Sequence, residues 1–261
     1  MKKKWFAAAL AGTLLAVLLL NGCASAQTVK RLRFGVAGEG GVYHAFGELY
    51  AALENETDNG TVELKTTAGS AANLRLLTGE YLQLAIAQAD LVQDAYDQTG
   101  IFADEEEDRG FGAVAALYTE TCQVVVRADS DIRSIEDLHG RTVSIGAEES
   151  GSEQNALQIL SAYGLNDKMV SMVNLNYEDA AAQLKAGRVD AIFMTVGAPS
   201  PVLTALAGEC GIRLLNVDGA AAQRLQSAYS AYSGVTLPAG TYPGQTEKVQ
   251  TVGVKAVLLA S

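Results

Sequence analysis

The sequence predicts an α/β fold built from two similar lobes. From Leu32 onward, apolar runs of strand length alternate with segments whose apolar residues recur at helical spacing. The order of elements also repeats. Residues 31–49 and 141–160 both predict a strand, a Gly/Ser loop and a helix, while 76–91 and 184–199 both predict a helix end, a glycine, a strand and a helix start.

The first half of the chain predicts a series of strand–helix units. The expected strands are 32–37, 61–67 and 81–88, and the expected helices are 43–55, 70–77 and 90–96. The acidic run 104–108 is more typical of a solvated surface than of a site. Two further strands are predicted at 111–118 and 122–129, the second of which we expect to cross between the lobes.

The second half restarts the pattern. After a short helix near 134–140, the expected strands are 142–147, 169–176, 189–197 and 212–217, and the expected helices are 152–163, 177–187 and 199–209. The helix at 199–209 has prolines in its first turn, where a missing N–H costs little.

Composition and charge limit the class of protein. The chain has 261 residues, 49% of them hydrophobic and 19% charged, with a formal charge of −11. Nucleic-acid binding needs a concentrated basic face, and the Lys/Arg runs are confined to 2–4 and 30–33. We therefore expect no nucleic-acid partner.

The N-terminus predicts export. A basic start is followed by the apolar core 5–20, which is short for a membrane-spanning helix of about 20 residues. Leu20-Asn21-Gly22-Cys23 resembles a bacterial lipobox, so we expect a lipoprotein signal peptide at 1–22, a lipid on Cys23 and a tether at 23–31. The alternative is plain secretory cleavage near Ala26. Either way, the location is extracytoplasmic: periplasmic or anchored to the cell membrane.

Metal and nucleophile motifs are missing from the sequence. His44 and His139 stand far apart, and neither CxxC nor GxSxG occurs. We therefore expect no metal, no cofactor and no enzyme activity. Cys122 and Cys210 form either a disulfide or two free thiols, and the free thiols are favoured because sequence does not fix their separation.

The glycine-rich stretch "GEGGVY" does not match a nucleotide loop. A dinucleotide fingerprint needs glycine where Tyr43 stands, and a P-loop needs lysine where Gly41 stands. What remains is the general property of a helix N-terminus, whose free N–H groups favour an anion that glycine allows to approach closely. We expect Gly41 to tolerate no side chain.

Five predicted helix starts share this chemistry, at 40–43, 69–73, 88–90, 150–153 and 197–200. Ligands in open α/β sheets bind beyond the carboxyl ends of strands, so two facing lobes place these loops around one cleft. Backbone donors with Ser, Asn, Gln and Tyr suit a small carboxylate. The alternative for each loop is a capped helix, because Ser70 and Ser152 are good N-caps in any case. Asp90 is interpreted as a cap.

Several stretches, among them "GVAGEGGVYHAFGELYA", "TTAGSAANLRLL", "LAIAQADLVQDAYDQTGIF" and "AIFMTVGAPSP", resemble the TAXI family of solute-binding proteins of TRAP transporters. The resemblance extends in order over nearly all of 32–254. It implies a periplasmic-binding-protein type II fold, with two α/β lobes, a hinge and a central ligand cleft. It also implies sodium-driven uptake through a separate membrane permease, a ligand such as glutamate or a related dicarboxylate, and a monomer.

The resemblance assigns ligand contacts to both lobes. They are Gly40, Gly41, Val42, Tyr43, Gly69, Ser70, Asn73 and Gln88 in the first lobe, and Ser150, Gly151, Ser152, Thr195, Gly197 and Pro199 in the second. The sequence departs from the family at Ala89, which replaces a serine, at Glu148 and Glu149, which replace small residues, and at Val196, which replaces a glycine. These departures suggest an altered ligand preference.

The lobe boundaries follow from the same resemblance: lobe 1 covers 32–124, with 249–261 returning to it, and lobe 2 covers 125–248. Family members continue past the "TVGVKAVLLAS" strand, so the chain is interpreted as C-terminally truncated, with an exposed apolar run at its end. Three functions remain in order of preference: a binding protein for uptake, a sensory ectodomain of the same fold without a transport partner, and an exported enzyme.

Overall fold

The computed structural model describes residues 31–56, 60–105 and 110–261. The expected signal peptide and the lipidation site Cys23 lie outside these ranges. Within them, no helix is both long enough and apolar enough to span a lipid bilayer.

The first lobe contains three parallel strands and the helices that follow them. The first two helices begin directly after Gly41 and Gly69, as the sequence predicts, and the third begins directly after Gln88 at the end of its strand. The elements are β1 (Arg31–Gly35), α2 (Val42–Asn55), β2 (Thr61–Lys65), α3 (Ser70–Thr78), β3 (Leu84–Gln88), α4 (Ala89–Asp97) and the 3₁₀ turn η1 (Gly100–Phe102).

The second lobe repeats this arrangement, and its first two strands are shorter than those of the first lobe. Its elements are η2 (Glu136–Leu138), β5 (Thr142–Ser144), α5 (Gly151–Ala162), β6 (Ser171–Val173), α6 (Tyr177–Lys185), β7 (Ala191–Val196), α7 (Pro201–Cys210), β8 (Ile212–Leu215), α8 (Gly219–Ala228) and β9 (Ser233–Leu237). Strands β5, β6 and β7 are parallel to one another. Every residue of β7 is buried, which explains its unbroken apolar sequence.

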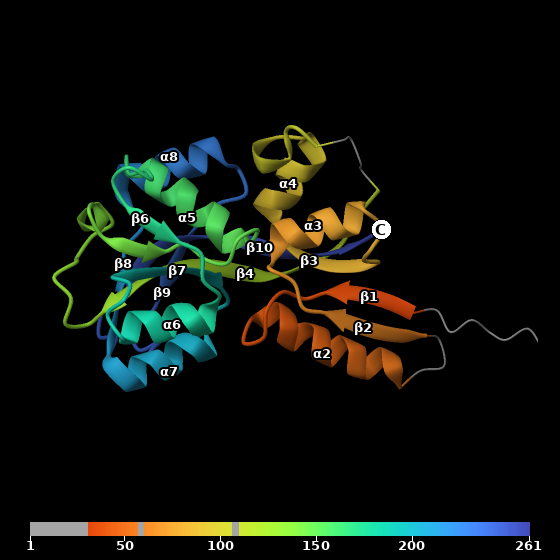
Figure 1. The fold of residues 1–261 in the computed structure, drawn as a ribbon, viewed down its shortest axis with the longest axis horizontal. Coiled ribbons are helices and arrows are strands. Elements are labelled where there is room, and N and C mark those ends of the chain that lie inside the picture. The colour runs from red at the N-terminus through yellow and green to blue at the C-terminus, as the bar shows by residue number, and fades with distance from the viewer. Residues whose placement is uncertain (1–30, 57–59, 106–109) are drawn as a thin grey trace, which may run out of the picture.

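Two long strands join the lobes, β4 (Gly112–Arg127) and β10 (Val249–Ala260). β10 pairs with β9 through Val249–Gly253 and with β3 through Ala256–Ala260. β4 pairs with β10 up to Thr121 and with β7 from Thr121 onward. The described sheet therefore runs β2-β1-β3-β10-β4-β7-β5-β6, with β8 on β4 and β9 on β10 (Figure 1).

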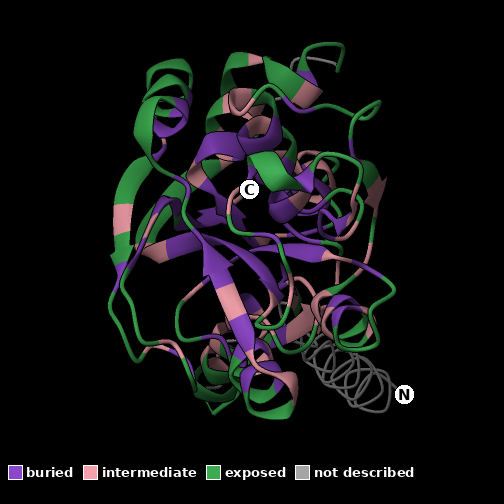
Figure 2. Ribbon diagram, turned by 90° about the vertical axis from the view of Figure 1, so that its left-hand side faces the viewer, coloured by how far each residue is buried: buried purple, intermediate pink, exposed green. Residues whose placement is uncertain are grey.

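Helices cover both faces of this sheet in each lobe (Figure 1). In the first lobe, α3 and α4 pack onto one face of the sheet through Leu74 and Leu91. The helix α2 packs onto the other face, against a buried cluster that includes Phe34 of β1. In the second lobe, α5 and α8 cover one face and α6 and α7 the other. The strands form the buried interior between these layers (Figure 2).

Two sequence predictions are corrected by this architecture, and the two free thiols that the sequence favoured are found. The predicted strands 111–118 and 122–129 are one continuous strand, β4. The C-terminal apolar run is not exposed, because β10 lies between β3 and β4 with Leu259 fully buried. Cys122 and Cys210 are free thiols, since Cys122 packs in the cluster under α5 while Cys210 packs in the cluster under α7.

Candidate functional site

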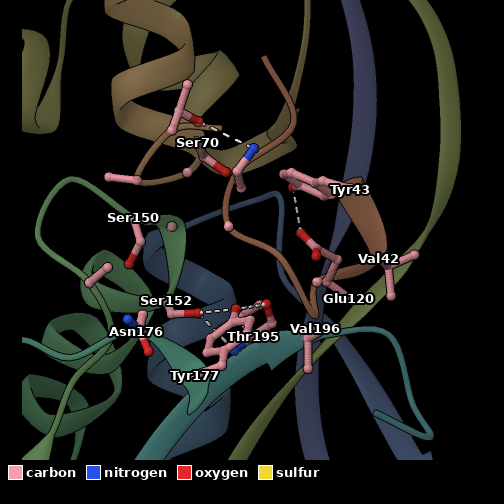
Figure 3. A pocket seen from close by; sticks show the side chains of 18 of the residues that line it. Val42, Tyr43, Ser70, Glu120, Ser150, Ser152, Asn176, Tyr177, Thr195 and Val196 are labelled. Atoms are coloured by element: carbon pink, nitrogen blue, oxygen red, sulfur yellow. Dashed lines mark hydrogen bonds between the residues drawn. The ribbon is translucent and has the colours of Figure 1, made fainter. Parts of the chain in front are cut away.

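A cavity of about 270 Å³ lies between the lobes, where the carboxyl ends of parallel strands from both lobes meet (Figure 3). The loops after β1 and β2, the end of β3 and the middle of β4 form its first-lobe wall. The loops after β5 and β6 and the end of β7 form the other wall. The lining residues are Ala37, Gly38, Glu39, Gly41, Val42, Tyr43, Thr66, Thr67, Ala68, Gly69, Ser70, Gln88, Glu120, Ala147, Ser150, Gly151, Ser152, Asn176, Tyr177, Glu178, Thr195 and Val196.

Five helices begin at this cavity, because the N-cap residues of α2, α3, α4, α5 and α6 all line it. These residues are Gly41, Gly69, Gln88, Ser150 and Asn176. Ser150 and Asn176 cap their own helices through side-chain oxygens, whereas the caps of α2, α3 and α4 make no such bond. The starts of α2 and α3 therefore keep N–H groups for a ligand, apart from the Ala72 N–H, which donates to the Glu149 carbonyl oxygen. The partial positive charge of each helix N-terminus stands behind them.

One buried carboxyl group stands on the first-lobe wall. Glu120, in the middle of β4, is 3% exposed, and its Oε2 accepts a hydrogen bond of 2.6 Å from the Tyr43 hydroxyl (Figure 3). Burial raises the pKa of Glu120 to about 8, against the lowering effect of its hydrogen bonds to Tyr43 and Gln88. The carboxyl is therefore mostly protonated at pH 7 as long as no cation balances its charge.

Three polar groups form a closed triangle on the second-lobe wall (Figure 3). The Tyr177 hydroxyl donates to the Thr195 carbonyl oxygen at 2.9 Å, the Thr195 N–H donates to Ser152 Oγ at 2.9 Å, and Ser152 Oγ lies 2.8 Å from the Tyr177 hydroxyl. Because each hydroxyl is held by two partners, this wall presents fixed dipoles. Burial raises the pKa of Tyr177, so it remains a neutral phenol.

The lobes contact each other beside the cavity. The Ala72 N–H donates to the Glu149 carbonyl oxygen at 3.2 Å, and Arg75 Nη1 lies 2.7 Å from Glu149 Oε1. Deeper in, the Asn155 amide of α5 donates to Asp90 Oδ2 of α4 at 2.7 Å. Asp90, which we expected to act as a cap, lies in the first turn of α4, whose N-cap is Gln88, and bonds across the lobe junction. Burial raises its pKa to about 6.

Two glycines permit this close approach. Gly69 has a φ of +136°, and a Cβ on it would lie 3.2 Å from Ser150 Cα. A Cβ on Gly151 would lie 2.1 Å from Gln88 Oε1. Gly41, which we expected to tolerate no side chain, has more room, because the nearest atom to its Cβ would be the Gly38 carbonyl oxygen at 3.3 Å.

The structure brings ten of the fourteen predicted ligand residues to the cavity. They are Gly41, Val42, Tyr43, Gly69, Ser70, Gln88, Ser150, Gly151, Ser152 and Thr195. The loop after β2 is held to the end of β3 by the Gln88 N–H, which donates to Ser70 Oγ at 3.1 Å.

The other four predicted residues lie outside the lining. Asn73 is fully buried, and its amide donates to the carbonyl oxygens of Gly35 and Ile86 at 3.2 and 2.8 Å, so it joins β1 to β3. Gly40 and Pro199 are exposed, and Gly197 packs near Val42.

The sequence did not single out Glu120, Asn176 or Tyr177. A signal for Glu120 exists, since a lone carboxylate interrupts a long apolar stretch that predicts a buried strand, and buried charges are rarely retained without a partner. Asn176 and Tyr177 stand where a strand gives way to an amphipathic helix, which is the same signal that marked the other loops.

Solved structures share this fold. The alkanesulfonate-binding protein SsuA from Xanthomonas axonopodis pv. citri, bound to MOPS, aligns with a TM-score of 0.55 at 18% identity over 88% of this chain and 65% of that one. The periplasmic aliphatic sulphonate-binding protein SsuA from Escherichia coli aligns with a TM-score of 0.51 at 19% identity over 88% and 65%. An ancestral arginine-binding protein bound to arginine gives 0.52 at 18% over 88% and 84%.

At these identities the likeness establishes the fold, which is of the type II periplasmic-binding-protein kind. The chain spans about two thirds of the length of the SsuA proteins, 65% in each case. The family model described as NMT1-like matches residues 34–261, so the chain belongs to the NMT1-like family.

Proposed function

We propose that this chain is an extracytoplasmic solute-binding protein of a TRAP-type transporter of the TAXI class. It captures a small carboxylate, such as glutamate or a related dicarboxylate, and converts no substrate. The observation that carries the proposal is the set of five helix N-termini that begin at one cavity between the lobes. The sequence resemblance to TAXI proteins supports the class of transporter.

The geometry suits capture without chemistry. A carboxylate oxygen is stabilised by N–H groups at a helix start, and the first-lobe starts at Gly41 and Gly69 leave such groups uncapped by side chains. The triangle of the Ser152 and Tyr177 hydroxyls and the Thr195 backbone supplies fixed dipoles from the opposite wall. Each of these hydroxyls is neutral and held by its partners, which favours binding over nucleophilic attack.

The lobes of the proposed protein are 32–124 with 249–261, and 125–248. They close on the ligand by a bend in β4 and β10, the two strands that run through both lobes. Gly253 lies at this crossing, and a Cβ there would lie 2.4 Å from the Glu120 carbonyl oxygen. A bend at this point therefore moves the wall that carries Glu120.

The proposed protein is a monomer held at the outer face of the cell membrane by a lipid on Cys23, and it delivers its ligand to a separate sodium-driven permease. The alternative is a sensory ectodomain of the same fold without a transport partner. Co-purification with a membrane permease favours the first function, and co-purification with a receptor chain favours the second.

Thermal unfolding with a panel of small carboxylates tests ligand binding. A ligand at 100 times its Kd stabilises the folded state by about 2.7 kcal/mol, which raises the Tm of a chain of this size by about 5–10 °C. We expect such a shift from L-glutamate or a dicarboxylate such as glutarate. If neither these nor other small carboxylates raise the Tm, the proposed function is wrong.

A matched pair of glycine variants tests the location of the site. Gly151→Ala places a Cβ against Gln88 across the lobe junction, so we expect ligand affinity to fall by about tenfold or more. Gly208→Ala on α7 meets nothing within 4 Å and serves as the control. Equal affinity in both variants would show that the ligand binds without closure at this cavity.

A further inference from the structure

The charged side chains of the cavity are all acidic. Among its lining residues, every one of which the structure describes, the ionisable acids are Glu39, Glu120 and Glu178, and none is Lys, Arg or His. Glu39 and Glu178 are exposed, whereas Glu120 is 3% exposed. A carboxylate ligand therefore finds helix N-termini but no basic side chain, and it shares the cavity with one buried carboxyl group.

The groups that face Glu120 do not supply a cation. They are the hydroxyls of Tyr43 on α2 and Tyr118 on β4, the amide of Gln88, and the carboxyl of Asp90 on α4. The Tyr177 hydroxyl faces it from α6. These described neighbours stabilise the ionised form of Glu120 only through hydrogen bonds, and Asp90 adds a like charge that opposes ionisation.

The cavity is also arranged with two poles. The uncapped helix starts at Gly41 and Gly69 provide N–H donors and partial positive charge. Glu120 provides the opposite charge from the middle of β4, where it pairs with Val254 of β10. A buried carboxyl is stable as an ion when a cationic N–H donor pairs with it. A molecule with an ammonium group and a carboxylate satisfies both poles at once.

Resting on the proposed function, we propose that Glu120 binds a cationic nitrogen of the ligand, so that the cavity takes a small amino-bearing carboxylate in preference to the same acid without an amine. The carboxylate of that ligand lies toward the helix starts and its ammonium group toward Glu120 and Tyr43. Pairing with the ammonium keeps Glu120 ionised, which reverses the effect that burial has on its pKa.

Isothermal titration calorimetry of the wild-type protein at pH 7 tests this proposal with matched probes. The probes are the standard amino acids, beside glutarate, succinate and propionate as acids without an amine. We expect at least one amino acid to bind and glutarate to bind at least tenfold more weakly. The proposal about Glu120 is overturned if glutarate or another amine-free acid binds as tightly as every amino acid, or if no amino acid binds. In both cases, binding of an amine-free acid leaves the proposed function standing. If no probe binds, both are overturned.

The variant Glu120→Gln provides the second arm, because it keeps the shape of the side chain and removes its charge. We expect the affinity for the amino acid to fall at least tenfold and the affinity for glutarate to stay the same or rise. The control is Glu209→Gln, an exposed carboxyl on α7 outside this cavity, which should change neither affinity. Equal losses for both probes in Glu120→Gln would contradict recognition of the amine.

Discussion

Glu120 and Asp90 are two buried carboxyls near the lobe junction, 3% and 4% exposed, that have opposite surroundings. The protein itself supplies Asp90 with an amide donor, since Asn155 from the other lobe lies 2.7 Å from its Oδ2. Glu120 is hydrogen-bonded within its own lobe, to Tyr43 and Gln88, and borders the cavity. The comparison teaches that Asp90 joins the lobes, whereas Glu120 is left for a group that arrives from outside.

Their pKa values express the same difference. Burial raises the pKa of Asp90 to about 6 and that of Glu120 to about 8, from ordinary values of 3.8 and 4.5. A raised carboxyl pKa means that the unfolded state loses its proton at a lower pH than the folded state does. Stability is therefore fully present below the ordinary value and falls as pH rises toward the folded value.

The largest effect should appear in the pH dependence of stability. Between pH 6 and 8, Glu120 is protonated in the folded state but not in the unfolded state, whereas Asp90 has already lost its proton in both. The free energy of unfolding of the ligand-free protein should therefore fall by about 1.4 kcal/mol per pH unit. Glu120→Gln should remove this slope, while Asp90→Asn should remove a slope between about pH 4 and 6. Urea unfolding from pH 4 to 9 measures both.

A wild-type slope that persists between pH 6 and 8 in Glu120→Gln would break the comparison, because another group would then be titrating. Unfolding in the presence of an amino acid gives a second test of the comparison between the two carboxyls. A ligand ammonium lowers the pKa of Glu120 toward its ordinary value, so a saturating amino acid should flatten the slope in the same window, and glutarate should not.

Removal of the donor to Asp90 should have the next largest effect. Asn155→Leu fills a similar volume but leaves the Asp90 carboxyl buried without its amide partner, so we expect a loss of about 1–3 kcal/mol in unfolding free energy at pH 7. The double variant with Asp90→Leu should recover part of this loss, since it removes the orphaned carboxyl. Denaturant unfolding measures the unfolding free energy of each variant. If the double variant is no more stable than Asn155→Leu, the lost stability comes from packing and not from the unpaired carboxyl.

Removal of the donor to Glu120 should have the smallest effect. Tyr43→Phe deletes the 2.6 Å hydrogen bond and keeps the ring, and Glu120 remains mostly protonated at pH 7. We expect a loss of about 1 kcal/mol in stability, and a pKa for Glu120 that rises further, because the tyrosine bond lowers it. A loss larger than that of Asn155→Leu would invert the comparison and make Glu120 the structural carboxyl.

Much of the fold follows from local signals in the sequence. Glycine and serine between an apolar run and an amphipathic segment placed the starts of α2, α3 and α5 within one residue, because each signal lies within a few residues of the element that it marks. The same locality explains why ten predicted ligand residues line the cavity. Loops after parallel strands share one edge of a sheet, whatever the details of packing.

The errors arise where the answer depends on distant parts of the chain. The polar residues 119–121 split β4 into two predicted strands, although they mark the place where one strand passes the cavity. The apolar end of the chain was predicted to be exposed because its partner strands, β3 and β4, are far away in sequence. Asn73 was assigned to ligand because an amide that joins two strands has the same sequence signal as one that binds a solute.

The place of β10 in the sheet has a consequence for biogenesis. It is the last strand in chain order, yet it separates β3 from β4 and pairs with both. A chain that emerges from its N-terminus cannot complete the first lobe until residues 249–260 are available, so the stable form is reached late. For the export that we propose, a nascent chain that stays unfolded for this long remains suited to threading through a narrow translocation channel.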